Sequence, residues 1–197
     1  EKIRMLTEAG IYKDAGMFNF KEIQRQKTKV VEKLVGGVNG LLKHHNVAVF
    51  KGEAILKADK VVECNGKRYT ANHIVIATGS RPAMISIPGV EHAITSTDLL
   101  AIPSIPKRLT VIGGGVIGLE LSSAFNSFGS KVTVIEMMDS LLPKEQPQAG
   151  TQLKKTLEKN GLTFHLSARV NRIEKRDGVC RTIFTVGDKE GSIESEL

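Results

Sequence analysis

Three glycines, Gly113, Gly115 and Gly118, are spaced as G-x-G-x-x-G between an apolar run and an apolar segment of helical periodicity. In this pattern the first glycine permits a tight turn, the second lets the backbone approach a pyrophosphate, and the third lets a helix pack closely on a strand. The candidate contacts of a dinucleotide are Gly113, Gly114, Gly115, Val116, Ile117 and Gly118. The alternative is that the glycines serve only a tight strand-to-helix turn.

The segments around this fingerprint favour the dinucleotide site. An apolar strand is expected over residues 108–112, a helix over 116–128 and a second strand over 131–136. Gly129 should end the helix. A glycine fingerprint between a strand and a helix is much more specific than the glycines alone.

The second strand ends in Glu136, about 20 residues after the fingerprint, where a carboxylate can accept hydrogen bonds from the adenosine ribose. Its charge would repel a 2′-phosphate, and Met137 and Met138 follow where a phosphate site would use Arg. We therefore expect NAD rather than NADP. The alternative is that Glu136 is a solvated residue at a strand end.

Composition narrows the class of protein. The 197 residues are 41% hydrophobic, enough to bury a core in one large or two small domains. No run approaches the ~20 apolar residues of a membrane span and no signal peptide opens the chain, so we expect a cytoplasmic protein without membrane contact. The net charge is +7, but basic and acidic residues are interspersed. With no Trp and two Tyr there is no aromatic platform for bases, which argues against nucleic-acid binding.

The cysteines and histidines suggest no further chemistry. Cys64 and Cys180 have neither metal-ligand nor C-x-x-C spacing, so we expect buried, reduced thiols and no metal site. Solvated or core positions are the better interpretation of all five histidines, and no catalytic residue is assigned.

The first half of the chain predicts a long helix, a meander and a strand. The helix is expected over residues 19–46, and the antiparallel meander around 53–71. Asp59-Lys60 and Asn65-Gly66 are its expected turns. The apolar run His73–Ala77 is typical of a fully buried parallel strand.

The second half repeats this order after a proline-rich crossing over residues 83–107. A helix is expected over 145–160, a strand over 162–166, a hairpin over 169–186 and a further strand from 192. The first unit begins after the point where its nucleotide-binding turn would stand, and the second stops before a closing strand. The sequence therefore resembles an internal section of a longer chain.

These features together resemble the flavin-dependent pyridine nucleotide–disulfide oxidoreductases, and within them the lipoamide branch. The resemblance covers essentially the whole chain and rests on four segments, which are residues 18–23, 74–82, 106–121 and 132–136. It implies an α/β fold of two Rossmann-like (FAD/NAD-binding) units, each with an antiparallel β-meander. The first unit would lack its N-terminal part and the second its closing strand.

The resemblance also implies domains and site residues. Residues 1–105 would be the C-terminal part of the FAD-binding domain, and residues 106–197 a truncated NAD-binding domain. The implied FAD contacts are Ala54, Thr78, Gly79 and Ser80. In the NAD domain the fingerprint would hold the pyrophosphate, Glu136 the ribose, Val170 would lie near the adenine, and Glu120 near the nicotinamide and flavin. The alternatives are turn geometry for the backbone contacts, sheet core for Val170 and an ordinary helix-surface role for Glu120.

The implied reaction reoxidises dihydrolipoyl groups, carried by an acyltransferase or carrier protein, with NAD through FAD and a redox disulfide. The full-length parent would be a homodimer. The family's cysteine pair, its first glycine fingerprint and its His-Glu pair have no counterpart in this chain, so we expect the chain alone to be inactive. Residues 146–148 (Gln-Pro-Gln) depart from a usually acidic stretch. A glutathione or mercuric reductase-like enzyme and a stand-alone, non-catalytic dinucleotide-binding module remain as alternatives.

Overall fold

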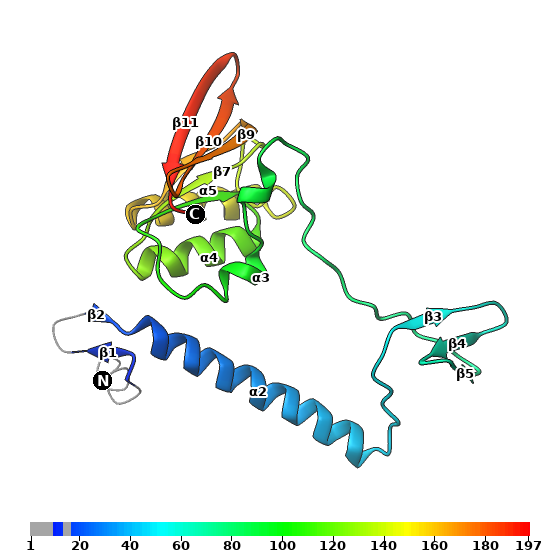
Figure 1. The fold of residues 1–197 in the computed structure, drawn as a ribbon. Coiled ribbons are helices and arrows are strands. Elements are labelled where there is room, and N and C mark those ends of the chain that lie inside the picture. Colours follow the sequence, from blue (N-terminus) through cyan, green and yellow to red (C-terminus); the bar gives the residue numbers. More distant parts are fainter. Residues whose placement is uncertain (1–9, 14–16) are drawn as a thin grey trace. The chain divides into compact units, whose positions relative to one another are not determined.

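The computed structural model describes residues 10–13 and 17–197, and these fall into two compact units (Figure 1). One unit joins the described residues up to Ile23 with Pro82–Leu197, and the other is Gln24–Arg81. Residues 83–107, expected at a domain crossing, thus belong to the compact unit that holds the fingerprint. The domain boundary between residues 105 and 106 stays a prediction.

A parallel sheet forms the centre of the first unit. Its strands β6 (Arg108–Ile112), β7 (Lys131–Ile135) and β8 (Thr163–His165) lie in that order, each parallel to the next. Helix α4 (Val116–Ser127) connects β6 to β7, and α5 (Pro147–Lys159) connects β7 to β8. These elements confirm the strand–helix–strand–helix–strand order expected from the sequence.

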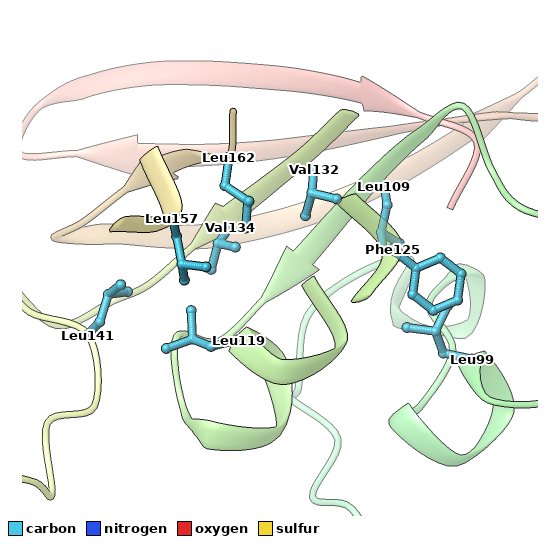
Figure 2. Packing of buried hydrophobic residues seen from close by; sticks show 9 residues of the cluster. All are labelled: Leu99, Leu109, Leu119, Phe125, Val132, Val134, Leu141, Leu157 and Leu162. Carbon is cyan, nitrogen blue, oxygen red and sulfur yellow. The ribbon is translucent and has the colours of Figure 1, made fainter. Parts of the chain in front are cut away.

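One apolar cluster joins this sheet to its helices (Figure 2). Its buried members come from α3, α4, α5, the strands β6 and β7 and their connections, and they are Leu99, Leu109, Leu119, Phe125, Val132, Val134, Leu141, Leu157 and Leu162. The β6 and β7 residues belong to nearly continuous apolar runs, as is usual for parallel strands covered on their faces. The cluster therefore includes residues of both elements that flank the fingerprint loop, Leu109 of β6 and Leu119 of α4.

Helix α4 ends as its glycine predicts. Gly129 has φ +99° and donates a hydrogen bond to the Asn126 carbonyl at 2.9 Å. The Ser130 amide donates to the Phe125 carbonyl at 3.0 Å, which completes a Schellman cap. Gly161, with φ +97°, follows α5 in the same way.

An antiparallel sheet follows β8. Strands β9 (Ala168–Arg176), β10 (Val179–Val186) and β11 (Lys189–Ser195) are ordered β11-β10-β9, and the turn at Asp177-Gly178 has positive φ at both residues. The hairpin is confirmed, and β11 begins three residues before the expected position 192. Just beyond β11, the Leu197 carbonyl accepts a hydrogen bond from the Thr110 amide at 2.8 Å, so this sheet is tied to β6.

Short elements precede β6 in the same unit. These are the strands β1 (Tyr12–Lys13) and β2 (Met17–Phe18), the 3-10 helix η1 (Val90–His92) and the helix α3 (Ser96–Leu99). The chain just before η1 lies against β9, because the Pro88 carbonyl accepts from the Ile173 amide at 2.9 Å. The chain around Pro88 and η1 is thereby held on the antiparallel sheet.

The second unit has a helix and a small sheet. Helix α2 (Phe20–His44) starts at an Asn19 cap and continues into this unit, and none of its residues is buried. Strands β3 (Ala54–Leu56), β4 (Val61–Cys64) and β5 (Lys67–Thr70) form an antiparallel sheet, which confirms the predicted meander and its two positive-φ turns. The apolar face of α2 is exposed at Val30, Val31, Leu34, Val35, Val38 and Leu41.

The prediction for His73–Ala77 is wrong. This segment is not a strand, and Val75 and Ile76 are 86% and 70% exposed. A fully buried parallel strand needs a parallel neighbour and helices on both faces. The strands in the described part of this unit form only the antiparallel β3-β4-β5 sheet, so the run has no parallel strand to pair with.

Within the described ranges, no helix combines the length and apolar character needed to cross a bilayer.

Candidate functional site

The fingerprint turn lies between β6 and α4, and its first and third glycines have steric reasons to be glycine. Gly113 has φ +112°, and its amide donates to the Ile135 carbonyl at 2.8 Å, which fixes the turn to β7. A Cβ on Gly118 would clash with the carbonyl oxygen of Gly113. The turn therefore folds tightly over the start of α4, as the glycine spacing predicts.

The second glycine of the pattern, Gly115, is the N-cap of α4 and leaves open space in front of the helix. A Cβ added there would meet no atom within 4 Å, and the side chains of Val116 and Ile117 are exposed. The first amides of a helix have no intrahelical acceptor, and the helix dipole adds positive potential at this end. This end of α4 is thus open to a phosphate group.

Glu136 follows β7, and its carboxylate is hydrogen-bonded to the same turn. The residue is 9% exposed. Its Oε2 accepts from the Gly114 amide at 2.6 Å, and its Oε1 accepts from the Met138 amide at 2.7 Å. A carboxylate offers about four lone-pair sites, so each oxygen can accept one more hydrogen bond. The acid is thereby oriented beside the fingerprint with acceptor capacity left for a hydroxyl.

The other candidates near the fingerprint lie in different environments. Met137 and Met138 are exposed beside Glu136, and Glu120 is exposed on α4. Val170 is 8% exposed and belongs to a buried cluster with Ile135, Ala168 and Phe184. The turn and Glu136 are therefore brought together, whereas the proximity of Val170 and Glu120 to a nucleotide stays a prediction.

A cavity of about 540 Å³ in this unit reaches the fingerprint. Its lining includes Gly113, Gly115 and Gly118, together with the Pro82–Ile85 segment and residues of β6, but not Glu136 or Val170. The hydroxyls of Thr110 and Ser195, which line it, are buried and unpartnered. Sequence reasoning missed this cavity, because it arises where segments far apart in the chain pack together and no local motif marks it.

The candidate FAD contacts lie in the second unit. Ala54 is exposed at the start of β3, opposite Cys64 in the sheet. Thr78, Gly79 and Ser80 are exposed in an irregular segment, where Gly79 has φ +76°. The structure assigns no turn at these three residues, and their contact with FAD, which the resemblance implies, stays a prediction.

The two cysteines are buried free thiols, as predicted. Cys64 ends β4 in one unit, and Cys180 lies in β10 in the other. Neither is paired with the other. Among the described residues, no three His, Cys, Asp or Glu side chains gather as a metal site would require.

Comparison with known proteins places this geometry in a family. The family model described as pyridine nucleotide-disulphide oxidoreductase matches residues 4–197. The chain is 37% identical over 186 residues to the dihydrolipoyl dehydrogenase of Acholeplasma laidlawii, covering 91% of this chain and 54% of that protein. It is also 37% identical over 205 residues to that of Bacillus subtilis, covering 100% and 43%.

Solved structures agree. The flavoprotein disulfide reductase RclA of Escherichia coli, in a Cu(II) complex, superposes with a TM-score of 0.78 at 25% identity. That match covers 98% of this chain and 43% of RclA. The chain therefore spans about half, or less, of the length of the proteins it matches.

Proposed function

Because the chain belongs to the pyridine nucleotide–disulphide oxidoreductase family, we propose that it is the section of a dihydrolipoyl dehydrogenase that positions FAD and NAD. The observation that carries the proposal is the Glu136 carboxylate, which is hydrogen-bonded to the Gly114 amide within the fingerprint turn. An acid in this place suits the adenosine ribose of NAD and disfavours a 2′-phosphate. Members of the family use FAD together with a nicotinamide nucleotide.

Different residues around the fingerprint would bind different parts of NAD. The α4 amides behind Gly115 would bind the pyrophosphate, and the oriented Glu136 carboxylate would accept from the ribose hydroxyls. Glu120 would lie near the nicotinamide, and Val170 near the adenine. In this arrangement the chain binds and orients the acceptor of the hydride.

The second unit would contribute to the FAD site. Ala54 would offer a backbone contact to the adenine, and the turn Thr78–Ser80 would close over the flavin cofactor. We also propose that residues up to 105 and from 106 onward are parts of two Rossmann-like domains, for FAD and NAD respectively.

In the proposed reaction, electrons pass from a dihydrolipoyl dithiol to an enzyme disulfide, then to FAD, and as hydride to NAD. The dithiol would be carried by an acyltransferase or carrier protein, and the whole enzyme would be a cytoplasmic homodimer. Cys64 and Cys180 are free and lie in different units, so this chain contributes cofactor positioning and no redox pair.

A chimera tests this proposal. The segment of the Bacillus subtilis enzyme that matches this chain over 205 residues would be replaced by the chain, and dihydrolipoamide-dependent NAD reduction would be assayed. We expect an FAD-loaded chimera that turns over with NAD and far less with NADP. An FAD-loaded chimera without turnover, or one that prefers NADP, would refute the assignment. The matched control is the same chimera with Glu136→Ala, which should keep its FAD and lose affinity for NAD.

A further inference from the structure

We propose that Leu141 is a positioning residue for the dinucleotide site, which holds the Gly114 peptide and through it the Glu136 carboxylate. This inference rests on the proposed NAD site. It goes further by assigning a role to a residue that touches no nucleotide and belongs to no motif in the sequence.

Both polar groups of the Gly114 residue are held from outside the turn. Its amide donates to Glu136 Oε2 at 2.6 Å, and its carbonyl accepts from the Leu142 amide at 3.1 Å. The position of this residue therefore depends on two segments. One is Glu136 at the end of β7, and the other is Leu141-Leu142 in the connection to α5. A shift of that segment would move the carboxylate's partner.

The Leu142 backbone is itself in an uncommon conformation. Its φ is +52°, in the left-handed region that leucine rarely adopts. Such a conformation persists only where the surrounding structure holds it. Here it accompanies the hydrogen bond from the Leu142 amide to the Gly114 carbonyl, so the contact with the fingerprint depends on how this segment is held.

The Leu141 side chain connects this segment to the core. It is 2% exposed and belongs to the apolar cluster that includes Leu119 of α4 and Leu157 of α5 (Figure 2). A Cβ on Gly114 would lie 2.7 Å from Leu141 Cδ2 and 3.2 Å from the Glu136 Cβ and Cγ atoms. Gly114 thus packs closely against both side chains, and a larger residue there would have to displace the end of the Leu141 side chain.

Helix α5 supports Leu141 from its backbone side. Gly150 is buried in α5, and a Cβ there would clash with the Leu141 carbonyl oxygen. The close approach of α5 therefore fixes the position of the Leu141 backbone. Leu141 in turn fixes the position of Gly114. The packing of α5 through its buried residues Gly150 and Leu157 is in this way transmitted to the carboxylate proposed to bind ribose.

The experiment compares Leu141→Ala with Leu162→Ala in the 197-residue chain. Leu162 is a leucine of the same cluster and 4% exposed, whereas the atoms nearest to a Cβ on Gly114 belong to Leu141 and Glu136. NAD affinity would be measured by calorimetry at a temperature where both variants are folded. We expect Leu141→Ala to weaken NAD binding at least tenfold more than Leu162→Ala, and Leu141→Met to restore it to within about threefold of wild type, because Met refills the volume.

A second pair of variants tests the support from α5. Gly150→Ala should weaken NAD binding, whereas Gly37→Ala, in α2 where a Cβ meets no atom within 4 Å, should leave it unchanged. A nucleotide-free measurement accompanies both pairs. Amide exchange at Gly114 and Met138 should be at least tenfold faster in Leu141→Ala and unaltered in Leu162→Ala.

The outcomes separate the two claims. A wild-type chain that binds no NAD would refute the proposed function, and the positioning role with it. A wild-type chain that binds NAD, with Leu141→Ala matching Leu162→Ala in affinity and in Gly114 exchange, would overturn the positioning role alone.

Discussion

At the scale of single residues, Glu136 has partners within the loop in addition to the ribose that it is proposed to bind. Its oxygens already accept from the Gly114 and Met138 amides, so the acid shapes the turn before any nucleotide arrives. Charge-assisted hydrogen bonds of this kind are stronger than neutral ones and pre-organise the acceptor. The same carboxylate would therefore serve both the structure of the loop and the recognition of ribose.

Replacing Glu136 by Ala should accordingly weaken NAD binding by about 1.5–3 kcal/mol, through loss of hydrogen bonds to a charged group. This corresponds to about 10- to 150-fold in the dissociation constant. The affinity for NADP should fall less, because repulsion of the 2′-phosphate is relieved. Calorimetry with both nucleotides measures the two effects, with Asp139→Ala, an exposed acid three residues later, as the control. Unchanged NAD affinity in Glu136→Ala would exclude the ribose role.

At the scale of elements, the packing of α4 against the fingerprint turn depends on Gly118. A methyl group there would meet the Gly113 carbonyl oxygen, so Gly118→Ala must displace the turn or the helix. We expect a loss of about 1–3 kcal/mol in the free energy of unfolding, as for other overpacked sites. Gly37→Ala should instead raise stability by up to about 1 kcal/mol, because it removes a glycine from an open helix. Urea unfolding of both variants provides the test, and equal effects of the two would contradict the close packing.

A second prediction for the elements concerns the link between β6 and the residues after β11. The Arg108 amide donates to Glu196 Oε2 at 2.6 Å, and its guanidinium forms an ion pair with Oε1 at 3.2 Å. The pKa of Glu196 lies below its ordinary value. The main cause is the hydrogen bond from the Arg108 amide, and the charge of the Arg108 guanidinium adds to it. A depressed folded-state pKa stabilises the fold above the unfolded value of about 4.3, and this contribution is lost as the pH falls through the folded pKa.

Since both side chains are more than a third exposed, screening should keep this contribution below about 1 kcal/mol. Glu196→Gln should remove it, so that wild type and variant differ at neutral pH and converge in acid. Unfolding free energies measured as a function of pH check this. A difference that persists or grows in acid would show that the ion pair is not its source.

The elements also show what the sequence could predict. The strands β6 and β7, the helix α4 and the Asp177-Gly178 turn depend on short-range signals, and they were predicted correctly from apolar periodicity and glycine placement. Leu141 carried no such signal, because its role comes from contacts with Gly114 and Gly150 that only the folded chain brings together. The prediction for His73–Ala77 is wrong for the same reason, since a parallel strand is defined by partners elsewhere in the fold.

At the scale of the whole molecule, the second unit exposes much apolar surface. The apolar face of α2 is uncovered, and so are Val75 and Ile76. The chain spans 54% and 43% of the Acholeplasma laidlawii and Bacillus subtilis enzymes. Exposed apolar surfaces of this kind usually mark sites of interaction with other molecules.

We therefore expect the 197-residue chain by itself to hold FAD weakly or not at all and to show no dihydrolipoamide turnover. Its single glycine fingerprint is committed to the proposed NAD site, so a pyrophosphate cradle for FAD is lacking in this sequence. Cys64 and Cys180 are free, buried and in different units, and therefore form no redox pair beside a flavin. A flavin spectrum and a dihydrolipoamide assay measure both properties. Yellow protein with stoichiometric flavin and turnover would show that the chemistry has been misplaced.

The measurement that most directly tests the central claim is a calorimetric titration of the 197-residue chain with NAD and, separately, with NADP. The oriented Glu136 carboxylate and the open N-terminus of α4 predict saturable binding of one NAD per chain, and at least about tenfold weaker binding of NADP because of repulsion at the 2′-phosphate. Absence of NAD binding by the folded chain, or tighter binding of NADP than of NAD, would contradict the assignment of this site.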